Sequence, residues 1–359
     1  MLTSLELRNF RLFEYLDLDF NAPRVFLCGS NGQGKTTILE AIFYLSSLRS
    51  FRTQKISELI TIHQNECVIS ADSFFFQWKR RLTARIGQKG TRLLSVDRNP
   101  VSKASEFAGS FHIVTFMPND PDIVTGSAAV RRKLLDMFIS MLDPDYFRAL
   151  QIYAAGVRNR NFLLKNKKLD SQVLNSFHTV ISQFGAKIVQ KREFHLKILS
   201  DFTNHVIGVL KPELADLSLK MKFQKDFANP DFFKHKLDSS VERDAATGYT
   251  SYGPQWDDFE FIADGKSLRQ YGSRGQCRAA AFSLKCAQFD ITQQHESSRN
   301  NTIVMVDDAT GDFDRKTQDA FYQRIAIAKQ TFYTFTELPS SSISSNAQII
   351  HISSGNALT

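Results

Sequence analysis

The sequence predicts an α/β protein with a second, helical lobe. Three observations lead to this prediction. An apolar run at 24–28 passes through a glycine-rich turn into a helical pattern, and a second apolar run at 302–306 ends in two aspartates. Residues 145–210 are helical in pattern and almost free of helix breakers. A chain of 359 residues has room for both lobes.

The N-terminal 30 residues read as strands. In SLELRNF the apolar Leu5, Leu7 and Phe10 alternate with polar neighbours, and YLDLDF alternates in the same way. The run RVFLC at 24–28 is apolar enough for a buried strand, and it leads directly into the glycine-rich turn.

The turn GSNGQGKT has the spacing G-x-x-x-x-G-K-T of a P-loop. Backbone N–H groups of such a turn point at phosphate oxygens, and the dipole of the following helix favours the same negative charge. Its lysine reaches the β- and γ-phosphates, and its threonine hydroxyl coordinates Mg²⁺. The alternative is a plain glycine-rich turn between a strand and a helix. The residues expected to bind the nucleoside triphosphate are Gly29, Ser30, Asn31, Gly32, Gln33, Gly34, Lys35, Thr36 and Thr37.

The next elements are less distinctive. Segments 66–86 and 91–97 predict a small antiparallel meander, and Phe111–Pro118 is the next apolar strand. A helix is expected from Ser127, its N-cap, with an apolar stripe that includes Leu134 and Phe138.

Two long helices joined near 165–170 are expected to form a projecting hairpin. Nine Lys or Arg and only two acids lie between 158 and 197. These cations are either a solvated helix face or an arm that follows the phosphates of a nucleic acid. The segment 212–250 then returns through strand, helix and loop.

The run TIVMVDD has the form of a Walker B segment, which is a buried strand that ends in a carboxylate. Asp307 is expected to hold Mg²⁺ beside Thr36, and Asp308 to act as the base or to position water. The alternative is that the two aspartates only cap a surface loop. About 270 residues separate this run from Lys35, a distance much longer than in small P-loop kinases and GTPases.

A third motif, YGSRGQ at 271–276, opens a helical pattern and resembles the signature loop of ABC-type ATPases. In that class the loop binds the γ-phosphate of an ATP held by another subunit, so Ser273, Gly275 and Gln276 are expected to contact nucleotide. The segment GDFD at 311–314 stands where a D-loop belongs. The fold prediction becomes a P-loop ABC-type ATPase head with a helical second lobe. Its expected parts are 1–125 and 251–359 in the ATPase lobe and 126–250 in the helical lobe.

Over essentially its whole length the chain resembles the RecF family of bacterial recombination mediators. The stretches that carry the resemblance are LELRNFRLFEYLDLDF, GSNGQGKTTILEAIFYLSSLRSFRT, VRRKLLDMFISMLDPDYFRALQIYAAGVRNRNFLLK, GPQWDD, SRGQ and VDDATGDFD. The resemblance implies a slow, DNA-dependent ATPase that uses ATP and Mg²⁺. It implies an ATP-dependent homodimer on duplex or gapped DNA or at single-strand junctions, with RecR- and RecO-type partners. The implied roles are recombinase loading in DNA repair, replication restart and SOS induction.

Three segments depart from the family pattern. MPNDP at 117–121 stands where the family usually has SPEDL, and GPQWDD at 253–258 stands in place of GPHRDD. The D-loop reads GDFD in place of the usual S-E-L-D pattern. These departures bear on the nucleotide-site details, on communication between subunits and on the rate of hydrolysis, but they leave the P-loop, Asp307 and the signature loop intact.

The bulk composition agrees with a nucleic-acid partner without requiring one. Lys and Arg number 45 against 37 Asp and Glu, so the net charge is +8. No apolar run is long enough to span a membrane, and the four cysteines have no metal spacing and are expected to be buried thiols in a reducing cytoplasm. The alternative functions are the ATPase subunit of another ABC-type machine such as a transporter, and a metabolic P-loop enzyme such as a kinase.

Overall fold

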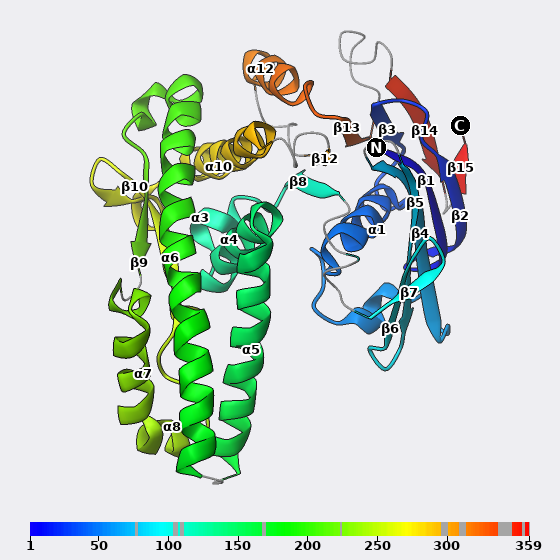
Figure 1. Ribbon diagram of the computed structural model, residues 1–359. Coiled ribbons are helices and arrows are strands. Elements are labelled where there is room, and N and C mark those ends of the chain that lie inside the picture. Colours follow the sequence, from blue (N-terminus) through cyan, green and yellow to red (C-terminus); the bar gives the residue numbers. More distant parts are fainter. Residues whose placement is uncertain are drawn as a thin grey trace. The chain divides into compact units, whose positions relative to one another are not determined.

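The computed structural model describes residues 1–75, 78–102, 107, 111–166, 170–222, 225–295, 301–308, 314–336, 347–353 and 356–358. The chain divides into two compact units. The first is Met1–Pro118 with Thr292–Thr359, and the second is Asn119–Ile291. Figure 1 shows the elements of each unit.

The first unit contains a sheet whose central strands are parallel and buried on both faces. Its spatial order is β15 (Asn356–Leu358), β14 (Ala347–Ser353), β3 (Arg24–Cys28), β13 (Gln330–Phe335), β12 (Thr302–Asp307) and β8 (His112–Phe116). All six residues of β12 are buried, which explains why its sequence is a continuous apolar run. Because β3, β12 and β13 are parallel neighbours, their carboxyl ends meet at one edge of the sheet.

The second sheet of this unit is antiparallel. Its order is β2 (Phe13–Asp19), β1 (Leu2–Phe10), β4 (Glu66–Phe75), β5 (Trp78–Gly87), β6 (Arg92–Val96) and β7 (Asn99–Val101). The predicted meander is confirmed as β4 to β7. Helix α1 (Lys35–Ser47) contacts strands of both sheets, and η1 (Ile56–Leu59) and α12 (Arg315–Ile325) are further helical elements of the unit. The helix α1 is therefore packed in the core, with ten of its thirteen residues buried.

The second unit is built on the predicted helical hairpin, which the structure confirms. Helix α5 (Pro144–Lys165) begins with a proline after its N-cap Asp143, and α6 (Ser171–Leu210) begins after its N-cap Asp170. Each N-cap carboxylate accepts two backbone N–H groups of the first helical turn. Figure 1 shows the two helices side by side, with α4 (Ala128–Leu142) against them.

The rest of this unit contains a small sheet and further helices. A three-stranded sheet has the order β11 (Lys266–Ser267), β10 (Asp258–Ala263) and β9 (Ser218–Lys222). The helices are α3 (Asp122–Thr125), α7 (Pro230–Ser239), α8 (Val241–Thr247), α9 (Leu268–Tyr271) and α10 (Arg274–Gln294), with the short turns η2 (Pro212–Leu214), η3 (Lys225–Ala228) and η4 (Pro254–Trp256).

The division of the chain differs from the predicted one. The segment 251–291 was expected in the ATPase lobe, but it packs in the unit Asn119–Ile291. The reason is pairing of β10 with β9 along five residues, reinforced by an ion pair between Arg131 on α4 and Asp258 on β10. These contacts join segments that are far apart in the sequence, so composition alone does not indicate them.

The basic arm is only partly exposed. Arg160 and Arg192 are buried and paired with acids, so these two cations cannot follow the phosphates of a nucleic acid. Lys167 and Lys168 lie outside the described residues. The four cysteines are free and buried, as expected. In the part of the chain that the structure describes, every helix is too short or too polar to cross a bilayer.

Candidate nucleotide site

The glycine-rich turn lies between β3 and α1, as the sequence predicts. Gly29 has a φ of 149°, and a Cβ at this position would collide with the backbone carbonyl of Ile352. Gly34 has a φ of 110°, and a Cβ there would meet the ring of Phe13 at 2.6 Å. Both positions combine a backbone conformation that side chains disfavour with a close approach, so they require glycine.

Lys35, the first residue of α1, is almost fully buried inside the loop. Its Nζ donates to the carbonyl of Ser30 at 2.8 Å and to the carbonyl of Gly29. Burial lowers the pKa of Lys35, and the carboxylates of Asp307 and Asp308 oppose that shift. The ammonium group is thus held by the carbonyls of the glycine-rich turn, and the two aspartates are near enough to act on its charge.

Thr36 and Asp307 meet across the sheet edge. The Thr36 hydroxyl lies 2.9 Å from Oδ1 and 3.0 Å from Oδ2 of Asp307. The Thr334 hydroxyl donates to the same Oδ1 at 2.7 Å. These are hard oxygen donors of the kind that Mg²⁺ prefers, and Mg²⁺ in nucleotide sites needs only one or two protein ligands. The donor set therefore fits a magnesium ion that accompanies a nucleotide.

Asp308 follows β12 directly and is exposed. Its φ is 46°, a left-handed conformation that turns the chain sharply at the strand end. The carboxylate is therefore free of the sheet, beside the Asp307 that meets Thr36. This is a suitable place for a group that accepts a proton or positions water.

The sequence reasoning did not single out Thr334 or the cluster around Glu40. Thr334 stands in register with Asp307 on the neighbouring parallel strand, and this register is the signal that could have found it. Glu40 is fully buried on α1 and accepts hydrogen bonds from Arg11 at 2.7 and 3.0 Å. Arg52 lies 3.4 Å from the same carboxylate. These cations anchor the P-loop helix to the turn between β1 and β2 and to the segment that follows α1.

The signature loop forms a reciprocal cap at the start of α10. The backbone N–H of Ser273 donates to the Gln276 side chain at 2.8 Å, and the N–H of Gln276 donates to the Ser273 hydroxyl at 3.2 Å. Ser273 and Gly275 are exposed. The structure brings the P-loop, Asp307 and Asp308 together in one unit, whereas Ser273, Gly275 and Gln276 belong to the other unit.

The segment GPQWDD, in which Gln255 and Trp256 depart from the family pattern, makes structural contacts with the helical hairpin. Gln255 accepts from the Tyr153 hydroxyl and donates to the carbonyls of Thr250 and Tyr252, and Trp256 is exposed. The Asp257 carboxylate accepts a hydrogen bond from the Arg192 guanidinium at 2.7 Å. Burial raises the pKa of Asp257 to about 6, and Arg192 opposes that shift. The motif therefore ties β10 to the helical hairpin.

The other two segments that depart from the family pattern are MPNDP at 117–121 and GDFD at 311–314. Burial lowers the pKa of Lys285 on α10, and Asp120 of the MPNDP segment opposes that shift. In GDFD, residues 311–313 lie outside the described residues, and Asp314 caps α12 by accepting from the N–H of Thr317 at 3.0 Å.

A model of the RecF/RecN/SMC N-terminal domain matches residues 1–354. A curated protein of Lachnoclostridium phytofermentans, named DNA replication and repair protein RecF, is 32% identical over 93% of this chain and 92% of its own length. The chain belongs to the RecF family. A RecF of Streptococcus suis (strain 05ZYH33) is 30% identical over 99% of this chain and 98% of its own length.

Solved structures agree with membership in the RecF family. One described as the recombination mediator protein RecF with ATP, in the RecFOR pathway, has a TM-score of 0.88 and 26% identity, and covers 99% of this chain and 96% of its own. The Smc head domain of Pyrococcus furiosus, at 15% identity and a TM-score of 0.53, shares the fold. The fold prediction, a P-loop ABC-type ATPase head with a helical lobe, is confirmed.

Proposed function

We propose that this RecF-family chain is an ATPase that uses its nucleotide to control binding to DNA during replication and repair. The observation that supports the ATPase most directly is the contact between Thr36 of the P-loop and Asp307 of the Walker B strand. Curated relatives carry the name DNA replication and repair protein, and one related structure is described as RecF with ATP. Together they favour a repair ATPase over a transporter subunit.

In this proposal the P-loop backbone and Lys35 hold the phosphates of ATP. Thr36 and Asp307 are the residues that would hold Mg²⁺, which would neutralise charge on the phosphates. Asp308 accepts a proton from the attacking water or orients it. Because Asp is one methylene shorter than Glu, we expect slow hydrolysis, which suits a switch that needs to be reset only occasionally.

The signature residues act from a second subunit in this proposal. Ser273, Gly275 and Gln276 lie at the start of a 21-residue helix, whose exposed N–H groups and dipole favour a phosphate. Two copies that meet head to tail about a twofold axis would enclose two ATP molecules. ATP would then control whether the chain is a monomer or a dimer.

DNA is the proposed ligand of the dimer, at gaps or at junctions between single and double strands. The net charge of +8 supports an anionic partner. On the hairpin, Lys187 and Lys197 remain exposed after the buried Arg160 and Arg192 are excluded. RecR- and RecO-type proteins are the proposed partners, since the related structures are described within the RecFOR pathway.

Sedimentation of the pure protein with and without ATP, and with and without gapped duplex DNA, tests this proposal. We expect a monomer without ATP, a dimer with ATP, and a further shift when both ligands are present. Turnover should rise with DNA and stay unchanged with small-molecule acceptors. A chain that hydrolyses ATP only when a small acceptor is supplied would be a metabolic enzyme.

A further inference from the structure

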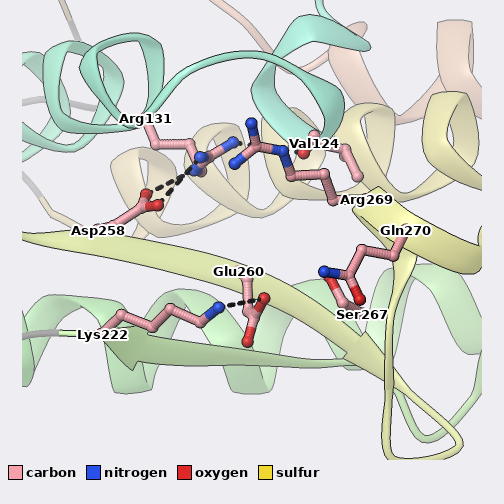
Figure 2. Close-up of a pocket in the computed structure, with 8 residues that line it drawn as sticks. All are labelled: Val124, Arg131, Lys222, Asp258, Glu260, Ser267, Arg269 and Gln270. Carbon is pink, nitrogen blue, oxygen red and sulfur yellow. Dashed lines mark hydrogen bonds and ion pairs between the residues drawn. The ribbon is translucent and has the colours of Figure 1, made fainter.

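A polar pocket lies within the unit Asn119–Ile291, next to the signature segment. Its volume is about 320 Å³. Figure 2 shows the side chains that line it, which come from α3, α4, β9, β10, β11 and α9. They are Val124, Arg131, Lys222, Asp258, Glu260, Ser267, Arg269 and Gln270.

The two carboxylates of the pocket are already neutralised. Asp258 accepts from Arg131 at 2.7 and 3.1 Å, and Glu260 pairs with Lys222 at 2.7 Å. Arg131 also donates to the carbonyls of three residues in the α3 turn. Neither carboxylate is therefore available to balance a further cation.

Arg269 supplies that further cation. Within the described residues its guanidinium has no hydrogen bond and no acidic partner, and Figure 2 shows it on the same side of the pocket as the guanidinium of Arg131. The Ser267 hydroxyl is buried and, among the described atoms, also has no partner. Gln270 adds an amide that likewise makes no hydrogen bond within the described part of the chain. Three lining residues from the segment 267–270 thus offer unused donors to one space.

We propose that this pocket binds a phosphate group. The planar guanidinium of Arg269 can donate two parallel N–H groups to phosphate oxygens, and the hydroxyl of Ser267 and the amide of Gln270 supply neutral donors beside it. Arg131 adds positive potential while it stays paired with Asp258. The phosphate comes either from the free ion or from a DNA backbone, since both present the same oxygens.

The pocket is linked to the signature loop through Leu268, which lies between Ser267 and Arg269. The carbonyl of Leu268 accepts from the N–H of Gly272 at 2.9 Å and from Sγ of Cys277 at 3.4 Å. Gly272 directly precedes Ser273. A phosphate held by Arg269 and Ser267 therefore stiffens the segment that positions the signature loop. This inference stands on the pocket itself and does not depend on the proposed function.

Protection of Arg269 from phenylglyoxal, followed by peptide mass spectrometry, tests the site on the full chain. Inorganic phosphate at ten times its dissociation constant should slow modification of Arg269 about tenfold, because the rate follows the free fraction. Chloride at equal ionic strength should not slow the modification of Arg269. Exposed Arg98 in the other unit is the internal control.

Ser267→Ala should weaken the protection, so that about ten times more phosphate is needed for the same effect, since one hydrogen bond to a charged group is lost. Lys266→Ala, which removes an exposed cation outside the pocket, should leave the protection unchanged.

Two further arms identify the source. A short DNA duplex that protects Arg269 better than free phosphate, at equal phosphate concentration, assigns the site to the DNA backbone, and the reverse order assigns it to the free ion. The Lys35→Ala variant should keep the protection, which separates this pocket from the P-loop. Equal slowing of Arg98, no slowing of Arg269, or equally strong protection by acetate would overturn the proposal of a phosphate site.

Discussion

The hydroxyl of Thr36 lies 2.9 Å from one carboxylate oxygen of Asp307 and 3.0 Å from the other, although 271 positions separate the two residues in the sequence. The contact forms because β3 and β12 are parallel strands of one sheet, on either side of β13. Thr36 follows the turn after β3, and Asp307 is the last residue of β12. The sheet edge thus brings together, from the two ends of the chain, the glycine-rich turn and the carboxylate that we propose as a magnesium ligand.

Replacing Lys35 with alanine should weaken ATP binding by at least about tenfold and abolish hydrolysis, because it removes the ammonium that we propose holds the phosphates. The free energy of unfolding should fall by only about 1 to 2 kcal/mol, since the side chain makes two hydrogen bonds to loop carbonyls. Nucleotide titration and chemical denaturation measure the two effects. Lys55→Ala, at an exposed lysine of the same unit, is the matched control. Wild-type turnover in the Lys35 variant would remove the basis for the nucleotide assignment.

Asp308→Asn should bind ATP normally and hydrolyse it at least about a hundredfold more slowly, because the amide cannot accept the proton. Asp308 is exposed, so folding should be unaffected. Size exclusion after addition of ATP should show a dimer that persists longer than that of the wild type. A variant whose dimer decays at the wild-type rate would argue that another group activates the water.

Arg160→Met should destabilise the helical unit by about 3 to 5 kcal/mol, because it removes the buried cation that pairs with the buried Asp244 at 2.8 Å. The Arg160 guanidinium also donates to His178 and Thr250, so the loss extends across α5, α6 and α8. Denaturant unfolding measures the change. Lys187→Ala, at an exposed residue of the same hairpin, should change stability by less than about 0.5 kcal/mol. A loss of similar size in both variants would contradict a structural role for the buried arginine.

The structure predicts loss of stability in mild acid through His178. Its Nε2 accepts from Arg160 at 2.9 Å, so the ring is neutral and its Nδ1 donates to Asp238. Burial lowers the pKa of His178 below 6.5, Asp238 opposes the shift, and Arg160 and Lys234 reinforce it. Below pH 6.5 the unfolded chain therefore binds a proton that the folded chain does not. The stabilisation is complete above pH 6.5 and declines as the pH falls, by at most about 1.4 kcal/mol for each pH unit.

Urea unfolding between pH 8 and pH 5 measures this slope. His178→Gln should flatten it, whereas His205→Gln, at an exposed histidine of the same helix, should leave it unchanged. If His178→Gln lowers stability equally at all pH values, the histidine is a packing residue and not the group that titrates.

Much of the nucleotide site was predictable because its chemistry is local. The spacing from Gly29 to Thr36 specifies a phosphate turn, and the run that ends at Asp307 specifies a buried strand with a carboxylate at its end. Thr334 was not predicted, because its role depends on strand register. The parallel pairing of β12 with β13 is formed between segments that are not adjacent in the sequence.

The arm shows where pattern reasoning fails. A count of charges cannot distinguish an exposed arginine from a buried one, and the acids that pair with Arg160 and Arg192 lie up to 84 positions away. The predicted domain boundary at residue 251 was wrong for a similar reason. Strand β10 pairs with β9, which follows the long helices in the sequence. This pairing places the signature segment in the helical unit, although the ATP that it is expected to contact is held by the P-loop of another subunit.

The central claim is that ATP joins the P-loop of one subunit to the signature loop of another, and mixing two variants tests it most directly. Lys35→Ala lacks a working P-loop, and Ser273→Arg blocks the signature loop. In a mixed dimer the intact P-loop of the Ser273→Arg subunit faces the intact signature loop of the Lys35→Ala subunit. Random mixing makes about half of the dimers mixed, so about a quarter of the wild-type sites should be rebuilt. ATP-induced dimerisation, followed by sedimentation alongside turnover, should therefore recover on mixing. If the two variants are each folded and their equal mixture recovers neither ATP-induced dimerisation nor turnover, the site shared between subunits is contradicted.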